Sequence, residues 1–272
     1  MFLPDNIDFT QSKKYILSIR LTPNGFYFSI HCPTDTTVFY QKSTVFSSNV
    51  NYLKSLEKIV FDYSFFNHNY LRINVIHVND RLTLVPTKYY DKKFESDILS
   101  FNLQNPIMKT KAMSNGINNL DCQVIWELDE SHHSFLSRSL LNPIFKSHLS
   151  ILISFFYRLH NKSKSALFVN FNDNDLMDII AFSNENLIFA KTFVTREPLE
   201  YSYFIQKTWE VLNMDAKTDS LFFSGKTVQH SACIKLHQKL ILNTKNLSLD
   251  LPNGVKINQS EIPTEIISLL CV

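Results

Sequence analysis

Apolar and polar positions follow the same pattern in two stretches of the chain. Residues Ile16–Gln41 align without a gap on Ala166–Lys191, at a constant offset of 150 residues. In each stretch, short apolar runs are separated by polar turns such as Thr22-Pro23-Asn24-Gly25, whose residues tolerate tight-turn dihedral angles. The repetition predicts two equivalent three-stranded meanders, each in its own sheet.

Each predicted meander is followed by apolar positions at helical spacing, at residues 53–60 in the first half and 205–212 in the second. Pro198 precedes the second of these helices and suits a first helical turn. Further strands and a second helix follow in each half. The strands are at 73–78, 81–85 and 220–223, and the helices are near 88–99 and 231–241.

The segment between the two halves predicts a strand at Gln123–Glu127 and a helix from about Glu130 to Leu140. After the break at Asn142-Pro143, an apolar helix is expected from about Lys146 to Leu159, whereas the polar stretch Asn102–Asn119 predicts a loop. A polar hinge at residues 161–165 sets the expected domain boundary. The first domain would cover residues 1–164 and the second residues 165–272.

Composition narrows the possible functions of the 272-residue chain. Hydrophobic residues make up 44%, which is enough for a sizeable core, and the formal net charge is only +2. Such a balance predicts neither a nucleic-acid nor an anionic-membrane partner. The four cysteines are scattered, the N-terminus does not resemble a secretory signal, and no apolar run is long enough to span a bilayer. A cytoplasmic location is therefore expected.

A unit of meander, helix, strand and helix that occurs twice resembles the duplicated ribonuclease-H-like fold of actin, sugar kinases and heat-shock chaperones. The finer pattern is similar to a Bacteroidetes family of unknown function that is described as having an actin-like ATPase fold. Leu82-Thr83-Leu84-Val85-Pro86 carries this resemblance, together with Trp209-Glu210-Val211-Leu212 leading to Leu221-Phe222-Phe223-Ser224-Gly225. It implies an α/β protein of two such domains, with mixed sheets flanked by helices.

The resemblance also implies where catalytic groups would lie. Actin-like ATPases use an Asp at the end of the first strand of each half, followed by a glycine-containing turn, to hold metal and phosphate. This chain has Arg20 and Asn170 at those positions, and Pro23 offers no amide hydrogen. We therefore expect neither ATP hydrolysis, nor a catalytic residue, nor a bound cofactor. The missing acids also disfavour a two-metal nuclease.

The cleft between two such domains is expected to persist as a shape. The residues expected to line it are Arg20, Asn24, Asn170, Asn172, Ser224 and Lys226. With two cations and no acid at either strand end, the cleft is predicted to be locally positive and to prefer an acidic side chain or a small anion.

Two further motifs have structural and functional interpretations. Ser224-Gly225-Lys226-Thr227 resembles the end of a phosphate-binding loop, but the glycine required five residues before Gly225 is Ser220, so a strand-to-helix turn is favoured. His230, Cys233 and His237 would share one helix face and are metal-ligand types. No fourth ligand is visible, and the triplet is expected to hold no metal.

These features favour a non-catalytic, actin-like pseudo-ATPase that binds a protein partner or acts as a scaffold. One alternative is binding of a small ligand or nucleotide in the cleft without hydrolysis, and another is an enzyme of unrelated chemistry on the same fold. The partner's identity is not predicted, and a homo-oligomer is compatible with the sequence.

Overall fold

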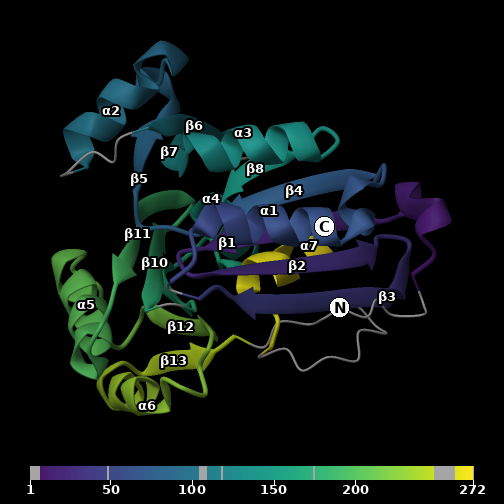
Figure 1. The fold of residues 1–272 in the computed structure, drawn as a ribbon. Helices are drawn as coiled ribbons and strands as arrows, with labels where there is room; N and C mark the ends of the chain where they lie inside the picture. The colour runs from purple at the N-terminus through teal and green to yellow at the C-terminus, as the bar shows by residue number, and fades with distance from the viewer. Residues whose placement is uncertain are drawn as a thin grey trace.

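The computed structural model describes residues 7–47, 49–103, 109–117, 119–173, 175–247 and 261–271. Within these ranges the chain forms two five-stranded sheets and one three-stranded sheet. Figure 1 shows the two larger sheets side by side, with the small sheet and its helix at one end of the molecule.

The first large sheet has the strand order β3-β2-β1-β4-β8. Strands β1, β2 and β3 form an antiparallel meander, and β4 and β8 are added in parallel. The bounds are β1 (Ile16–Thr22), β2 (Gly25–Cys32), β3 (Asp35–Val45), β4 (Arg72–His77) and β8 (Ile144–Ser147). The predicted helix from Lys146 therefore begins slightly too early, because the residues after Pro143 extend along β4 before the chain turns helical.

The second large sheet repeats this arrangement in the order β11-β10-β9-β12-β13. Its meander is again antiparallel, and β12 and β13 are again parallel additions. The bounds are β9 (Ser165–Phe171), β10 (Leu176–Ser183), β11 (Asn186–Val194), β12 (Ser220–Gly225) and β13 (Asn243–Asn246). Two equivalent meanders in separate sheets, predicted from the sequence repeat, are thus confirmed.

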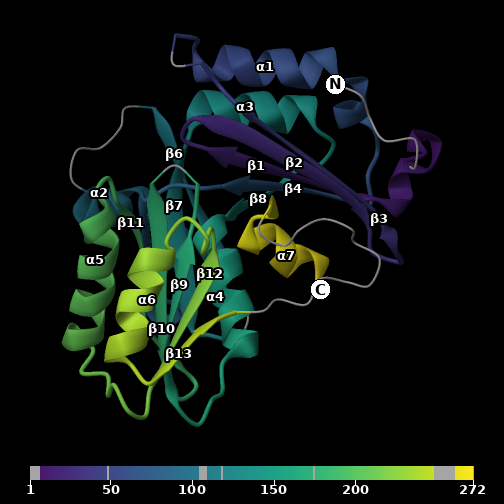
Figure 2. The ribbon, with the colours of Figure 1, turned by 90° about the horizontal axis from the view of Figure 1, so that it is seen from below.

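Helices cover the outer faces of both large sheets (Figure 2). In the first half, α1 (Tyr52–Asp62) and α3 (Glu130–Ser139) lie on one face. In the second half, α5 (Pro198–Val211) and α6 (Ser231–Leu240) lie on one face of their sheet, and α5 has proline in its first turn as predicted. The pattern of helix spacing therefore placed all four helices correctly within a few residues.

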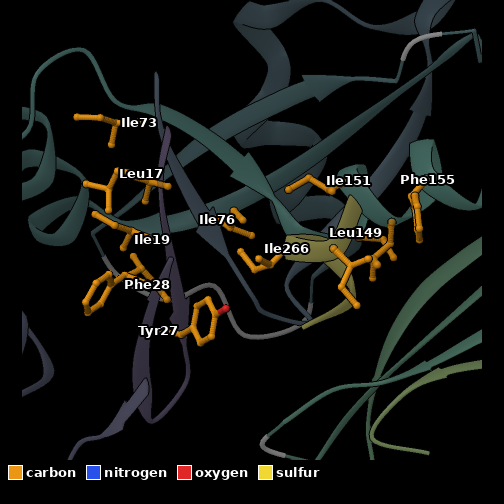
Figure 3. Close-up of a cluster of buried hydrophobic side chains, with 14 of the residues drawn as sticks. Leu17, Ile19, Tyr27, Phe28, Ile73, Ile76, Leu149, Ile151, Phe155 and Ile266 are labelled. Carbon is orange, nitrogen blue, oxygen red and sulfur yellow. The ribbon is translucent and has the colours of Figure 1, made fainter. Parts of the chain in front are cut away.

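Two helices fill the space between the sheets. Most of α4 (His148–Leu159) is buried, and its Phe156 stacks on Phe168 of the second sheet with ring centroids 4.9 Å apart. The C-terminal helix α7 (Thr264–Leu270) contributes Ile266 to the same core as strands of the first sheet, as Figure 3 shows. A helix from the end of the chain thus packs with the first half. The boundary between residues 164 and 165, immediately before β9, stays a prediction.

The strands at the centre of the second sheet are buried on both faces. Leu167 and Val169 of β9 pack beneath α5 and α6, whereas Ala166 and Phe168 belong to the core shared with α4. Because both faces are covered, the strand is a continuous apolar run rather than an alternating one.

The small sheet corrects the predicted loop. Strand β6 (Thr110–Gly116) lies within that loop and pairs with β7 (Cys122–Asp129), which also pairs with β5 (Leu82–Pro86); α2 (Glu95–Asn102) packs against this sheet. The polar side chains of β6 serve as bonding partners: Asn115 Oδ1 accepts from Trp126 Nε1 at 3.0 Å and from Ser147 N at 2.7 Å. Polarity in this segment reflects buried hydrogen bonding, which composition alone cannot distinguish from a loop. The rest of the predicted loop, residues 104–108 and 118, lies outside the described residues.

Candidate functional site

The duplication places Arg20 and Asn170 at equivalent positions near the carboxyl ends of β1 and β9. In the strand register, Arg20 lies opposite Tyr27 of β2, and Asn170 lies opposite Asp178 of β10. Both residues are almost fully buried, with 2% of Arg20 and 1% of Asn170 exposed. The two strand ends face one another, so the positions at which the resemblance implied metal-binding acids are part of the contact between the two halves.

All three nitrogens of the Arg20 guanidinium group donate hydrogen bonds at this contact. Its Nε donates to Glu265 of α7, its Nη1 to Asp173 Oδ2 at 3.2 Å and its Nη2 to Asn172 Oδ1 at 3.2 Å. Burial alone would lower the pKa of Arg20, but the charges of Glu265 and Asp173 outweigh it and raise that pKa above its ordinary value. Arg20 is therefore a permanent buried cation that joins the first sheet to the second and to α7.

The positive charge predicted for the cleft is largely offset by acids that the prediction did not consider. Asp173 lies between Arg20 and Lys226, with its Oδ1 3.4 Å from Lys226 Nζ. Glu265, fully buried on α7, neutralises Arg20 from the other side. The prediction considered only strand ends, whereas one acid comes from the following turn and the other from a helix 245 residues away in sequence.

Three of the predicted cleft residues lie in a buried network around Asp178. Asp178 Oδ2 accepts from Asn170 Nδ2 at 3.1 Å and from the side-chain amide of Asn172, and its Oδ1 accepts from Thr192 Oγ1 at 2.7 Å. Ser224 Oγ in turn donates to Asn170 Oδ1 at 3.0 Å. The side chains expected to face a ligand instead satisfy one another and a buried carboxylate.

His148, the first residue of α4, links this network to the first sheet. Its Nε2 lies 2.9 Å from Asp178 Oδ1, and its Nδ1 lies 3.2 Å from the backbone oxygen of His77. Because both partners are acceptors, both ring nitrogens carry hydrogen and the ring is an imidazolium. Burial alone would lower the pKa of His148, but the charge and hydrogen bond of Asp178 raise it above its ordinary value. His148 and Asp178 thus form a second buried ion pair between the halves.

A cavity of about 640 Å³ lies beside this contact. Three of the six predicted residues, Arg20, Asn24 and Lys226, line it together with β3 and the turn between β1 and β2. Asn170, Asn172 and Ser224 are not part of its lining. The walls of the cavity carry mixed charge, because Lys42, Asp173 and Glu261 also line it.

The segment Ser224–Thr227 forms the predicted turn after a strand. Gly225 has φ of +76°, and a Cβ there would lie 2.2 Å from Phe171 O. The backbone N–H of Lys226 donates to Phe171 O at 3.0 Å, and that of Thr227 donates to Gly225 O at 2.8 Å. The amides that a phosphate loop would present are therefore bonded within the fold.

The metal-ligand triplet of the sequence is divided among other contacts. His230 stacks on Phe171 with centroids 4.2 Å apart, and His237 Nδ1 lies 2.9 Å from the backbone oxygen of Cys233. Among the described residues, no group of three or more His, Cys, Asp or Glu side chains is arranged to hold a metal ion.

Sequence reasoning missed the buried charges that complete the contact. Asp178 lies within a stretch that the sequence predicts as a strand, and His148 lies within the predicted apolar helix. Glu265 lies in a helix that the sequence pattern does not predict. A sequence signal existed for Asp178 and His148, since single charged or titratable residues within apolar runs require a partner. Nothing in the sequence indicated that they would pair with each other.

Comparisons with known proteins agree with this fold. A profile described as "Protein of unknown function (DUF3822)" matches residues 4–244. A crystal structure of a Bacteroides thetaiotaomicron protein, described as having an actin-like ATPase fold and unknown function, superposes with a TM-score of 0.84 at 22% identity. That match covers 98% of this chain and 99% of the other. The PilM–PilN type IV pilus biogenesis complex superposes with a TM-score of 0.55 at 8% identity, over 94% of each chain.

These matches confirm the predicted fold class and the resemblance, and at such identities they show the fold alone. No curated protein matches the sequence. Within the part of the chain that the structure describes, no helix has the length and apolar character needed to cross a membrane.

Proposed function

The chain belongs to the DUF3822 family of proteins of unknown function and has an actin-like ATPase fold; we propose that it is a non-catalytic pseudo-ATPase that acts as a protein-binding or scaffold module. The observation that carries this proposal is Arg20. It stands where the fold family places a metal-binding acid, and its guanidinium is buried against Glu265 and Asp173. A cation at this point repels Mg²⁺ instead of ligating it.

The surrounding contacts support the same function. The equivalent position in the second half is Asn170, a neutral amide bonded to Asp178. The amides of the turn after Gly225 are bonded within the fold. The halves are linked without a nucleotide by the ion pair His148–Asp178 and by Arg20, which donates to Asp173 and Asn172 while its charge is also paired with Glu265. A module held closed by its own side chains presents a constant surface, which suits a scaffold better than an enzyme that must open and close.

The test has a catalytic and a binding arm. Purified wild-type protein is expected to release no phosphate from Mg-ATP above a buffer control, and the Arg20→Asp, Asn170→Asp double variant is expected to stay inactive because the turns still lack glycine. Tagged wild-type protein is expected to retain a specific protein from lysate of its native host. A phosphate release rate that is abolished by Lys226→Ala would refute the non-catalytic assignment. Failure to retain any protein would refute the scaffold assignment.

A second candidate is a small ligand in the cavity beside Arg20. The cavity of about 640 Å³ and its polar lining favour this alternative. Since Arg20 and Lys226 face Asp173 and Glu261, a ligand that carries both charges fits better than a simple anion. Thermal shift measurements with amino acids and with phosphate, repeated on Lys226→Glu, distinguish a ligand that carries both charges from a simple anion. A shift with phosphate alone that is lost in the variant would favour the anion.

A further inference from the structure

A groove of about 420 Å³ lies between the outer strand of the second sheet and the small sheet. Figure 1 shows β11 and β5 next to each other at this place. One wall consists of five consecutive residues of β11, Asn186 to Ala190, and the other includes Leu84 and Pro86 of β5 together with residues 120–122.

The β11 wall presents its backbone to the groove. Strand β11 has a bulge at Ile188, because Ala181 pairs with Phe189 and Phe182 with Leu187. Five consecutive residues on both sides of this bulge line the cavity, which indicates that the edge of β11 faces it. Strand β11 is the last strand in its sheet and pairs with β10 alone. Within the described ranges, residues 186–194 make no backbone–backbone hydrogen bond outside that pairing. The unpaired N–H and C=O groups on this edge are a template for another strand.

The opposite wall supplies apolar side chains rather than a competing edge. Strand β5 contributes alternate residues, Leu84 and Pro86, so one face of it lines the groove. Pro86 has no amide hydrogen and interrupts hydrogen bonding along that strand. Leu120 and Cys122 continue the apolar surface. A strand that enters the groove would therefore pair with β11 and pack its side chains against β5 and β7.

The charge of the lining restricts the occupant further. Asp121 is the one charged residue among those that line the groove, and within the described part of the chain no ion pair is formed by its side chain. An apolar segment that ends in Lys or Arg would complement it.

We propose that this groove binds an extended, largely apolar segment of a partner protein, with a basic residue near Asp121, as an added strand on β11. Residues 186–190 span about 17 Å at roughly 3.4 Å per residue, so the segment would pair over about five residues. The inference rests on the proposed function as a protein-binding module and assigns the surface that would carry it.

The test uses full-length protein and a displayed library of random decapeptides. Peptides selected on the wild type are expected to alternate apolar β-branched or aromatic residues with polar ones and to contain Lys or Arg. Amide hydrogen exchange in β11 is expected to slow when a selected peptide binds. Ile188→Asp, which places a carboxylate in the groove, should weaken binding about tenfold or more. Asp121→Asn should weaken it about threefold, with less dependence on salt.

Val194→Asp provides the matched control. Val194 lies on the same strand and is 42% exposed, against 41% for Ile188, but it does not line the groove. It should bind the selected peptides within about twofold of the wild type, since the change lies outside the groove. Circular dichroism establishes that both variants fold.

In the peptide experiment the proposal is overturned if no peptide is selected or if the selected peptides bind Ile188→Asp normally. It is also overturned if Ile188→Asp only disrupts a wild-type dimer, which would identify a second copy as the occupant. The peptide experiment and the lysate experiment together distinguish failure of the groove proposal from failure of the scaffold proposal. If a native partner is retained equally by Ile188→Asp, the groove is wrong and the scaffold function stands. If peptides bind β11 but lysate of the native host yields no partner, the scaffold function fails, and only the ability of this edge to take up a strand stands.

Discussion

The carboxyl ends of β1 and β9 are equivalent positions in the two halves of the duplicated fold, but one carries a charged side chain and the other a neutral one. The first presents Arg20, a buried cation whose partners lie in other parts of the chain. The second presents Asn170, a neutral amide beside the buried carboxylate of Asp178. The duplication thus preserved the backbone while the side chains diverged into complementary halves of one contact. Under the proposed function, a charged side chain at this strand end serves as a structural link between segments that are far apart in the sequence.

The largest difference between the two ends should appear when each side chain is removed. Arg20→Ala leaves Glu265 buried and unpaired, which should cost about 3–5 kcal/mol of unfolding free energy. Asn170→Ala, the equivalent change, removes one hydrogen bond to the Asp178 carboxylate and one from Ser224, and should cost about 1.5–3 kcal/mol. Urea denaturation measures both. Equal losses of unfolding free energy at the two positions would mean that Arg20 stabilises the contact no more than Asn170 does.

The second ion pair should make stability depend on pH. His148→Gln should cost about 3 kcal/mol at pH 6, where the wild-type ring is charged. Because the folded pKa of His148 is raised above 6.5, its contribution is complete below that pH and is lost as pH rises through the raised value. The difference in Tm between wild type and variant should therefore shrink toward pH 9.

Two other buried titratable groups near His148 affect stability in other pH ranges. Burial and, next, the charge of His148 lower the pKa of His77 to about 3, so its contribution falls as pH drops below about 6.5, outside the pH range in which the Tm difference is expected to shrink. Asp178, whose pKa is held low chiefly by the charge of His148 against the effect of burial, titrates below 3.8. A Tm difference that grows with pH would show that His148 is neutral in the folded protein.

The turn that follows β12 tests whether the second strand end is as rigid as its hydrogen bonds suggest. Gly225→Ala forces a Cβ against Phe171 O at a positive φ and should cost about 2 kcal/mol. Gly116→Ala is the control, because the nearest atoms to its Cβ belong to the flexible side chain of Gln123. Thermal unfolding compares the two, and a neutral Gly225→Ala would mean that this turn can relax.

The smallest effect is expected at the one partly exposed acid of the contact. Asp173 pairs with both Arg20 and Lys226, but 41% of its side chain is exposed. Asp173→Asn should therefore cost only about 0.5–1 kcal/mol, and less at 1 M than at 0.05 M NaCl. A loss as large as that of Arg20→Ala would place the main partner of Arg20 at Asp173 instead of Glu265.

The repeated pattern of apolar positions predicted most of the architecture, because strand and helix spacing are local properties that both copies express. It placed both meanders, and α1 and α5 after them. It failed at β6, whose polar Asn115 bonds to Trp126 of the neighbouring strand, and at α7, whose position depends on packing between distant segments. The cavity residues Arg20, Asn24 and Lys226 were predicted, but the charge of the site was not. Charge depended on Glu265, and no local pattern links it to Arg20.

The central claim is that side chains of the protein itself occupy the place where an actin-like ATPase would hold Mg-ATP. Calorimetric titration of the purified wild type with Mg-ATP tests it most directly. No saturable heat is predicted up to millimolar nucleotide, and none for Asn170→Asp, in which Arg20 and its partners remain. Stoichiometric binding of Mg-ATP to the wild type that weakens in Lys226→Ala would contradict the account.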